Sequence, residues 1–211
     1  EEFHRYIYEN HDVLFIAAAG NSGYRKTEYP ASYPEIMSVT MVDRYERREF
    51  SSTYNDQVEI SAPGVSVYST VPYNNDNNND DGYSKYKNKT GTSMAAPHVS
   101  GVAAKVWSHF PECTNVQIRN ALNRAARLTS YQDSCDMYYG HGIVDAVATY
   151  ELLRDEGCLA GGLPDKKAYG GCRENPEATD APSVVPSYSK LTSQAPNKYT
   201  CDQSEAVFLI S

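Results

Sequence analysis

The chain has 211 residues, of which 40% are hydrophobic and 22% charged, and its formal net charge is −8. This size and composition fit one globular domain with an appended tail. The negative charge argues against nucleic acid or an anionic membrane as a partner, and no apolar run approaches the roughly 20 residues of a membrane span.

Four segments in the first half of the chain are predicted to be β-strands. Residues 12–20, 36–43 and 58–64 are runs of apolar and small residues without strict alternation, which is typical of strands buried on both faces. Residues 65–71 alternate more. The Asn- and Asp-rich residues 72–89 indicate a solvated loop or the tip of a hairpin.

Three helices are predicted after this loop. The first spans 92–109, the second begins with a capping box formed by Thr114 and Gln117, and the third spans 145–157 between an Asp cap and a Gly stop. Buried strands followed by helices predict an α/β fold in which a parallel sheet forms the middle of three layers.

The composition changes after Cys158. Residues 159–211 are rich in Gly, Pro and Ser and show little periodicity, which predicts a tail or linker. We therefore assign residues 1–158 to one domain and 159–211 to a tail. The closing apolar run of this tail, residues 206–211, fits the first strand of a further module.

The cysteines all lie in the second half of the chain. Their spacings match no close-paired zinc site, and cysteines scattered among Gly, Pro and Asn favour disulfides in a secreted, extracellular protein; unpaired thiols are the alternative. We expect Cys113 to pair with Cys135, which brackets the second helix, and Cys158 to pair with Cys172. The odd count leaves one cysteine over. The five are Cys113, Cys135, Cys158, Cys172 and Cys201.

The segment GTSMAAP, residues 91–97, places a serine in the first turn of a predicted helix. A helix N-terminus offers unpaired N–H groups and a positive dipole end, so a nucleophile there has its own N–H available for an oxyanion. Gly91 allows another backbone to approach, and Thr92 is suited to cap the helix. Pro97 lacks the N–H that would bond the carbonyl of Ser93. A structural helix with an N-cap would explain part of this segment. A proline that breaks the helical hydrogen bonding so near the helix start favours a functional site.

One glycosylation sequon precedes this segment. Asn88, Lys89 and Thr90 match the acceptor pattern. Because the sequon lies just before Ser93 on a segment that should be packed, we expect Asn88 to be unmodified.

The string GTSMAAPHVSGVAA resembles the nucleophile motif of the subtilisin-like serine proteases, the subtilase family. The resemblance extends over about residues 12–157, because AAAGNSG, YPASYPEIMSVTMVD, ISAPGVSVYST and YGHGIVDA occur in the family's order. The sedolisins share a G-T-S-x-x-x-P string but place an aspartate in the oxyanion hole, where this chain has Asn21. The resemblance implies a serine endopeptidase that acts on proteins or peptides, is monomeric when complete, and uses Ser93 as nucleophile and the Asn21 amide as oxyanion donor.

The resemblance also implies a pocket for the substrate side chain that precedes the cleaved bond. The strand end and turn form one wall, and Glu28 lies at the far end, where a carboxylate would favour Lys or Arg. Two alternatives remain open: Arg25 or Lys26 neutralises Glu28, or the carboxylate turns to solvent. The predicted pocket residues are Ala18, Ala19, Gly20 and Glu28.

No cofactor is required by this chemistry, but the family can hold a structural cation through backbone carbonyls and an acidic side chain. Calcium prefers such hard oxygen ligands, and with one carboxylate the site would be weak or hold a monovalent ion. An empty turn with Glu59 on the surface is the alternative. The matching positions are Ala31, Tyr33, Ile36 and Glu59.

The family's other catalytic motifs, an aspartate in D-T/S-G and a histidine in H-G-T-H, do not occur in this chain. His98 follows Ser93 by five positions, about 140° around a helix and about 7.5 Å along it, so it cannot reach the hydroxyl. The remaining histidines, His4, His11, His109 and His141, have no catalytic motif around them.

We therefore interpret the chain as the C-terminal part of a peptidase domain whose N-terminal part is missing, and we expect it to be inactive by itself. The absence of an initial Met fits this interpretation. The alternative is a natural non-catalytic homologue that acts as a binding or scaffold protein. Such a protein would be free to lose Ser93 and Asn21, and both are intact.

Overall fold

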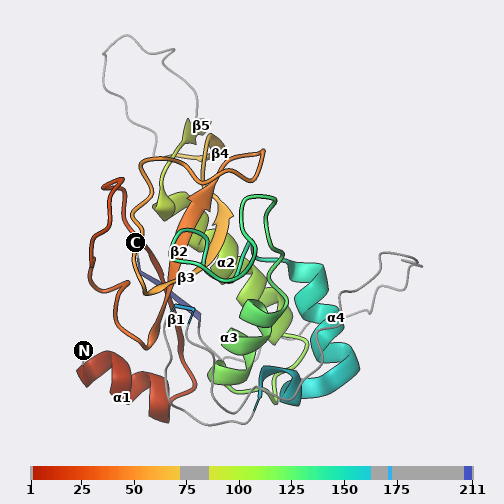
Figure 1. Cartoon of the computed structure of the whole chain (residues 1–211). Coiled ribbons are helices and arrows are strands. Elements are labelled where there is room, and N and C mark those ends of the chain that lie inside the picture. Colours follow the sequence, from red (N-terminus) through yellow and green to blue (C-terminus); the bar gives the residue numbers. More distant parts are fainter. Residues whose placement is uncertain (1, 72–85, 163–170, 173–206, 211) are drawn as a thin grey trace.

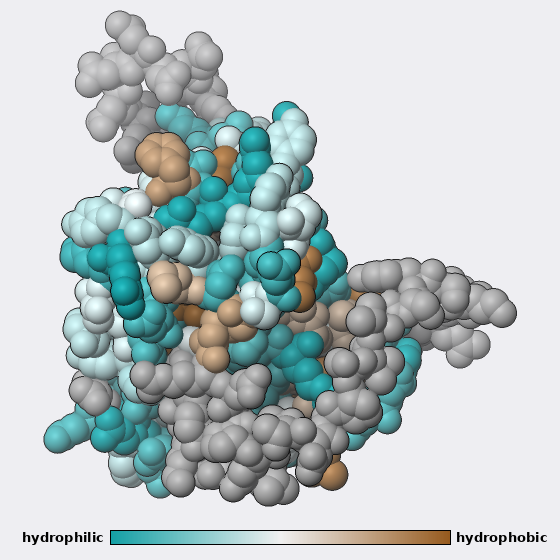
Figure 2. All heavy atoms as spheres, viewed as in Figure 1, coloured by the Kyte–Doolittle hydropathy of each residue, from teal (hydrophilic) through white to brown (hydrophobic). Residues whose placement is uncertain are grey.

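The structure is a computed structural model and describes residues 2–71, 86–162, 171–172 and 207–210 (Figure 1). The described surface in this view is largely hydrophilic, and its apolar residues form only small separate patches (Figure 2). Within the described part of the chain, no helix is both long and apolar enough to cross a membrane.

The centre of the fold is a four-stranded sheet in the order β3-β2-β1-β6. Its strands are β1 (Leu14–Ala18), β2 (Ile36–Val42), β3 (Val58–Pro63) and β6 (Val207–Ile210), and neighbouring strands are parallel throughout. All of β2 and nearly all of β1 and β3 are buried. The predicted α/β class with a parallel sheet is therefore confirmed.

The two faces of the sheet contact different elements, because alternate side chains of a strand point to opposite faces. Leu14 and Ile16 belong to a large core that includes Ala95, Val99 and other residues of the helix after β5. Phe15 and Ala17 belong to a smaller cluster with Tyr8 and Ile36. This alternation explains why the sequence of β1 is continuously apolar.

The smaller cluster is covered by a helix that the sequence analysis does not predict, α1 (Glu2–Asn10). Tyr8 is the one buried residue of this amphipathic helix, and the partly buried Ile7 packs against the same cluster, so α1 turns a narrow apolar face to the core. Tertiary contacts hold it in place: the Asn115 amide donates to the carbonyls of Tyr8 and Val13 at 2.8 and 3.0 Å. In Figure 1, α1 lies at the opposite side of the view from the last α-helix.

The three predicted helices are α2 (Thr92–Trp107), α3 (Asn115–Arg124) and α4 (Ala146–Glu156). The capping box is present, with Thr114 N–H donating to the Gln117 side chain at 3.0 Å and Gln117 N–H donating to the Thr114 hydroxyl at 3.3 Å. The Asp145 carboxylate caps α4, and the 3₁₀ helix η1 (Gly157–Gly161) follows directly. These starts follow from local hydrogen bonding, as predicted.

A two-stranded antiparallel hairpin, β4 (Val67–Thr70) and β5 (Tyr86–Lys89), stands apart from the main sheet (Figure 1). Part of the predicted loop, residues 72–85, lies outside the described residues. All four residues of β5 are exposed, including Asn88. The expectation that this sequon lies on a packed segment is therefore wrong.

The predicted disulfide pairing is also wrong. Cys113 pairs with Cys158, with Cα atoms 5.2 Å apart, and Cys135 pairs with Cys172 at 5.5 Å. The reason is tertiary, because α3 packs against α4 and η1, which places the start of α3 beside the end of α4. Cys201 lies outside the described residues.

Parts of the predicted tail contact the domain. The Asn120 amide donates to the Gly161 carbonyl at 2.8 Å, and a ring nitrogen of His141 lies 3.3 Å from the Gly171 carbonyl. Near the end of the chain, β6 extends the main sheet beside β1 instead of standing in a separate module.

Candidate active site

Ser93 is the second residue of α2 and is half-buried. Its N–H lies in the first helical turn, where no intrahelical acceptor exists. Pro97 stands inside the helix and withholds the N–H that the Ser93 carbonyl would otherwise accept. The helix nevertheless packs against the core, where Ala95 and Ala96 are fully buried.

The start of α2 differs from the expectation in one respect. The N-cap residue is Gly91, not Thr92, and as a glycine it has no side chain to cap the helix. The Gly91 N–H donates to the carbonyl of Gly64, just after β3, at 2.9 Å. A Cβ on Gly64 would lie 2.5 Å from the Met41 Cβ and 2.9 Å from the Gly91 carbonyl oxygen, so the close approach depends on Gly64.

Asn21 lies three residues after the end of β1, at the carboxyl edge of the sheet, where α/β sites form. Its Oδ1 accepts hydrogen bonds from the Thr92 N–H at 2.9 Å and the Thr92 hydroxyl at 3.2 Å. Because a backbone N–H can only donate, this contact assigns the oxygen of the Asn21 amide and turns its NH₂ group away from Thr92. That nitrogen lies 3.6 Å from where a Cβ on Gly91 would stand, and Asn21 is exposed.

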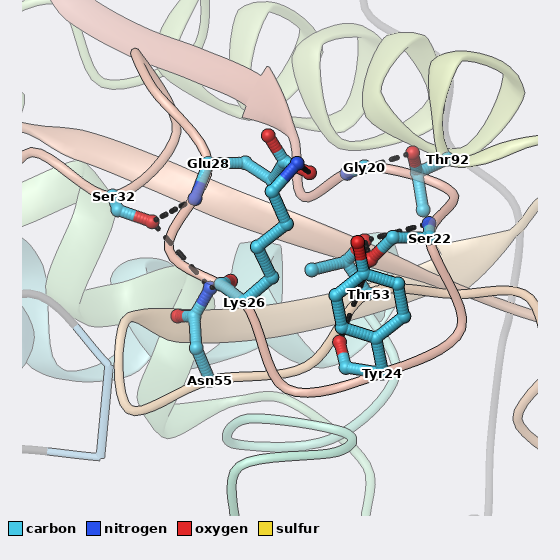
Figure 3. A network of polar contacts seen from close by, with 9 residues as sticks. All are labelled: Gly20, Ser22, Tyr24, Lys26, Glu28, Ser32, Thr53, Asn55 and Thr92. Carbon is cyan, nitrogen blue, oxygen red and sulfur yellow. Dashed lines mark hydrogen bonds and ion pairs between the residues drawn. The ribbon is translucent and has the colours of Figure 1, made fainter.

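The turn that carries Asn21 is also bound from a second side (Figure 3). The Thr53 N–H donates to the Gly20 carbonyl at 2.9 Å, and the Ser22 N–H donates to the Thr53 hydroxyl at 3.0 Å. The sequence analysis assigns no role to Thr53 or to the Thr92 hydroxyl. No sequence pattern could have predicted either contact, because each joins residues that are far apart in the chain.

All five histidines are described, and each has a contact that does not involve Ser93. His98 Nδ1 lies 2.8 Å from the Met94 carbonyl, one helical turn away. The chain as described therefore presents no histidine base to Ser93. The other ring contacts are His4 with Phe15 and Tyr33, His11 with Tyr6, His109 with Tyr150, and His141 with the Gly171 carbonyl.

Glu28, predicted to lie at the far end of the substrate pocket, has an ion-pair partner. A Cβ on Gly20 would lie 3.1 Å from the Glu28 Cγ, so Glu28 stands beside the turn. Its carboxylate forms an ion pair with the Lys26 ammonium at 2.7 Å (Figure 3). This contact raises the pKa of Lys26, first through the hydrogen bond and then through charge attraction. Of the wall residues, Ala19 is fully buried, and Ala18 and Gly20 are half-buried.

A separate polar cavity of about 440 Å³ lies behind the loop that carries Glu28. An ion pair between Arg25 and Asp56, 2.7 Å long, lies at its wall. Neither Ser93 nor any predicted pocket residue lines this cavity. Its lining residues are Arg25, Lys26, Thr27, Tyr29, Ser32, Asn55, Asp56 and Gln57.

Of the four predicted cation ligands, Glu59 already has partners. Glu59 is fully buried, not on the surface, and its Oε1 accepts from the Arg119 Nε and the Asn123 amide, both at 2.7 Å. Burial, the largest single effect, would lower the pKa of Arg119, but attraction to Glu59 and Tyr8 and the hydrogen bonds to both together raise it. The carboxylate of Glu59 is therefore neutralised by the guanidinium of Arg119.

In the backbone part of the predicted cation site, the Tyr33 carbonyl accepts the Ile36 N–H at 3.0 Å, which leaves one lone pair of that oxygen. The cation site stays a prediction. Among the described residues, one group of metal-ligand types gathers, Glu112 with Cys113 and Cys158. The two sulfurs form a disulfide and cannot serve as thiolate ligands.

Comparisons with known proteins agree with this geometry. The subtilase family model matches residues 2–142. The chain is 44% identical over 137 residues to a thermostable alkaline protease of Halalkalibacterium halodurans, covering 65% of this chain and 34% of that protein. It is 39% identical over 140 residues to subtilisin DY of Bacillus licheniformis, covering 64% and 46%. The chain thus spans less than half the length of these relatives.

Solved structures show the same fold. A psychrophilic subtilisin-like protease, Apa1 of Pseudoalteromonas sp. AS-11, matches with a TM-score of 0.64 and 25% identity, covering 75% of this chain and 68% of that one. Fervidolysin of Fervidobacterium pennivorans matches with a TM-score of 0.59 and 33% identity, covering 70% and 23%. With its parallel sheet and with Asn21 bound beside the start of the serine-bearing helix, the chain belongs to the subtilase family.

Proposed function

We propose that this chain supplies the nucleophile and the oxyanion hole of a subtilisin-type serine endopeptidase. The observation that carries the proposal is the Asn21 amide, which Thr92 fixes by two hydrogen bonds directly beside the helix turn of Ser93. In this mechanism the Ser93 hydroxyl attacks a peptide carbonyl. The N–H of Ser93 and the NH₂ of Asn21 then donate to the oxygen as it becomes negative.

The base that takes the Ser93 proton comes from residues outside this sequence. Two findings support this part of the proposal: the five histidines make other contacts, and the matched relatives are more than twice as long as the matched region. Without a base, a serine hydroxyl is a weak nucleophile. The isolated chain is therefore expected to be inactive and the longer protein active.

A fluorophosphonate probe tests both statements. The full-length protein should be labelled at Ser93 and the isolated chain should not. Replacing Asn21 by Ala in the full-length protein should lower kcat by about 10²–10³, the range known for a subtilisin oxyanion-hole asparagine. If the full-length protein is not labelled and cleaves no peptide, the chain belongs to a non-catalytic homologue.

The substrate preference depends on the pair formed by Lys26 and Glu28. A carboxylate that already binds an ammonium attracts a substrate Lys or Arg less strongly than a free one, so we propose that the pair weakens a basic preference. On a peptide library, Lys26→Met should increase cleavage after Lys and Arg, and Glu28→Gln should reduce it. A preference for large apolar residues that neither variant changes would remove Glu28 from the pocket.

We further propose that the protein acts outside the cell. Both disulfides in the described residues join segments distant in sequence, and such bonds persist in oxidising compartments. Culture supernatants of the native producer should contain the protein with both bonds intact, and recovery only from the reduced cytosol would exclude this location.

A further inference from the structure

Asn21 lies between two threonines that act on different parts of it. Thr92 binds its side chain, and its hydroxyl also accepts the Gly20 N–H at 3.2 Å. Thr53 binds the backbone on both sides of Asn21 from the loop between β2 and β3. Thr53 is fully buried, and its hydrogen bonds join Gly20, a wall residue of the predicted pocket, and Ser22, not Ser93 or the Asn21 amide.

The donors and acceptors around the Thr53 hydroxyl can all be paired in a single arrangement. The Ser22 N–H must donate, so Thr53 accepts at that contact, 3.0 Å long. The Thr53 proton is then available for the Ser22 hydroxyl at 2.8 Å, and the Ser22 proton for the Tyr24 carbonyl at 3.5 Å. A side chain without a hydroxyl would leave the Ser22 N–H without its acceptor.

Packing adds to these bonds. Gly20 has φ of +107°, a conformation that residues with a Cβ rarely adopt. A Cβ at Gly20 would lie 2.9 Å from the Thr53 hydroxyl oxygen. Thr53 therefore packs closely against Gly20, the residue before Asn21, and accepts a hydrogen bond from Ser22, the residue after it. Figure 3 shows Ser22 bonded to the neighbouring Thr53 and Gly20 bonded to Thr92.

We propose that Thr53 is a positioning residue of the oxyanion hole, acting through the Gly20–Ser22 turn. This inference rests on the proposed function. An oxyanion donor works only when it is held at the developing charge before the reaction, and a displacement near 1 Å can cost as much as 10²-fold in rate. Loss of the hydroxyl leaves Thr92 bound to the Asn21 side chain, so we expect a partial effect of about tenfold in kcat.

Three variants of the full-length protein test the proposal. Thr53→Val removes the hydroxyl at nearly constant volume and should lower kcat about tenfold with KM within about twofold. Thr53→Ser keeps the hydroxyl and should restore most of kcat. Thr40→Val is the matched control, because Thr40 is also fully buried, and its hydroxyl bonds the Ser61 hydroxyl and the Tyr138 carbonyl, at 2.9 and 3.1 Å. It should leave kcat unchanged.

The outcomes separate this inference from the proposed function. If Thr53→Val has the kcat of wild type, or if Thr40→Val lowers kcat equally, Thr53 does not position the oxyanion hole. If wild type itself is inactive, the proposed function fails, and a second measurement decides the inference. In the full-length Ser93→Ala protein, the side-chain NH₂ signals of Asn21, assigned through Asn21→Asp, should shift or broaden in Thr53→Val and not in Thr40→Val. Unchanged signals would overturn the inference.

Discussion

Replacing Arg119 by Met should strongly destabilise the fold. Arg119 and Glu59 are 2% and 0% exposed in their side chains and joined by two hydrogen bonds, so the variant leaves a buried carboxylate with only the Asn123 amide as partner. Breaking such a pair by removing one partner costs about 3–5 kcal/mol. A domain is stable by only about 5–15 kcal/mol in total.

Urea denaturation followed by the fluorescence of Trp107 measures this effect. Trp107 is the single tryptophan of the chain and is 1% exposed, so its emission reports the packing of α2. Arg124→Met is the matched control, because its pair with Glu156 is partly exposed and should be worth about 1 kcal/mol or less. The double variant Arg119→Met/Glu59→Gln should be more stable than Arg119→Met, since it removes the unpaired charge.

A free energy of unfolding of Arg119→Met within about 1 kcal/mol of wild type, or one no lower than that of Arg124→Met, would contradict this expectation. Either result would mean that water reaches Glu59 or that the pair is not buried in solution. A double variant as unstable as Arg119→Met would place the cost in lost packing around the guanidinium, not in the isolated carboxylate.

Three further predictions concern stability and modification. Non-reducing peptide mapping should find Cys113 joined to Cys158; replacing both by Ser should lower the free energy of unfolding by about 4 kcal/mol in the chain-entropy model for this loop, and a free Cys113 thiol would contradict the pairing. Burial raises the pKa of Tyr8 above 10.0 despite the attraction of Arg119, so the folded state keeps a proton that the unfolded state releases. Stability should therefore fall as pH rises through 10, and Tyr8→Phe should lose less between pH 9 and 11; equal losses would refute the assignment. Because Asn88 is exposed, expression in a eukaryotic secretory host should give a glycan that endoglycosidase removes and Asn88→Gln lacks; an unmodified Asn88 in that host would support the original expectation.

Features that depend on interactions between neighbouring residues could be predicted from the amino-acid sequence. Continuous apolar runs predicted β1, β2 and β3, because a strand buried on both faces needs apolar side chains in both directions. The starts of α3 and α4 followed from Thr114 and Asp145, whose side chains bond N–H groups two or three positions away. The motif around Ser93 and the asparagine at position 21 likewise carry the resemblance to the subtilase family, because each is a short string of adjacent residues.

Tertiary structure decided how distant residues pair. An isolated helix of nine residues is marginal in water, so α1 depends on tertiary contacts such as those of Asn115, more than 100 positions away. The same holds for the partner of Cys113 and for Glu59, which the sequence suggested as a cation ligand and the fold pairs with Arg119. Such pairings depend on which surfaces the packed helices and strands bring together, and periodicity and capping operate over only a few residues. The sequence could therefore name Asn21, but only the fold shows that Thr92 and Thr53 hold it in place.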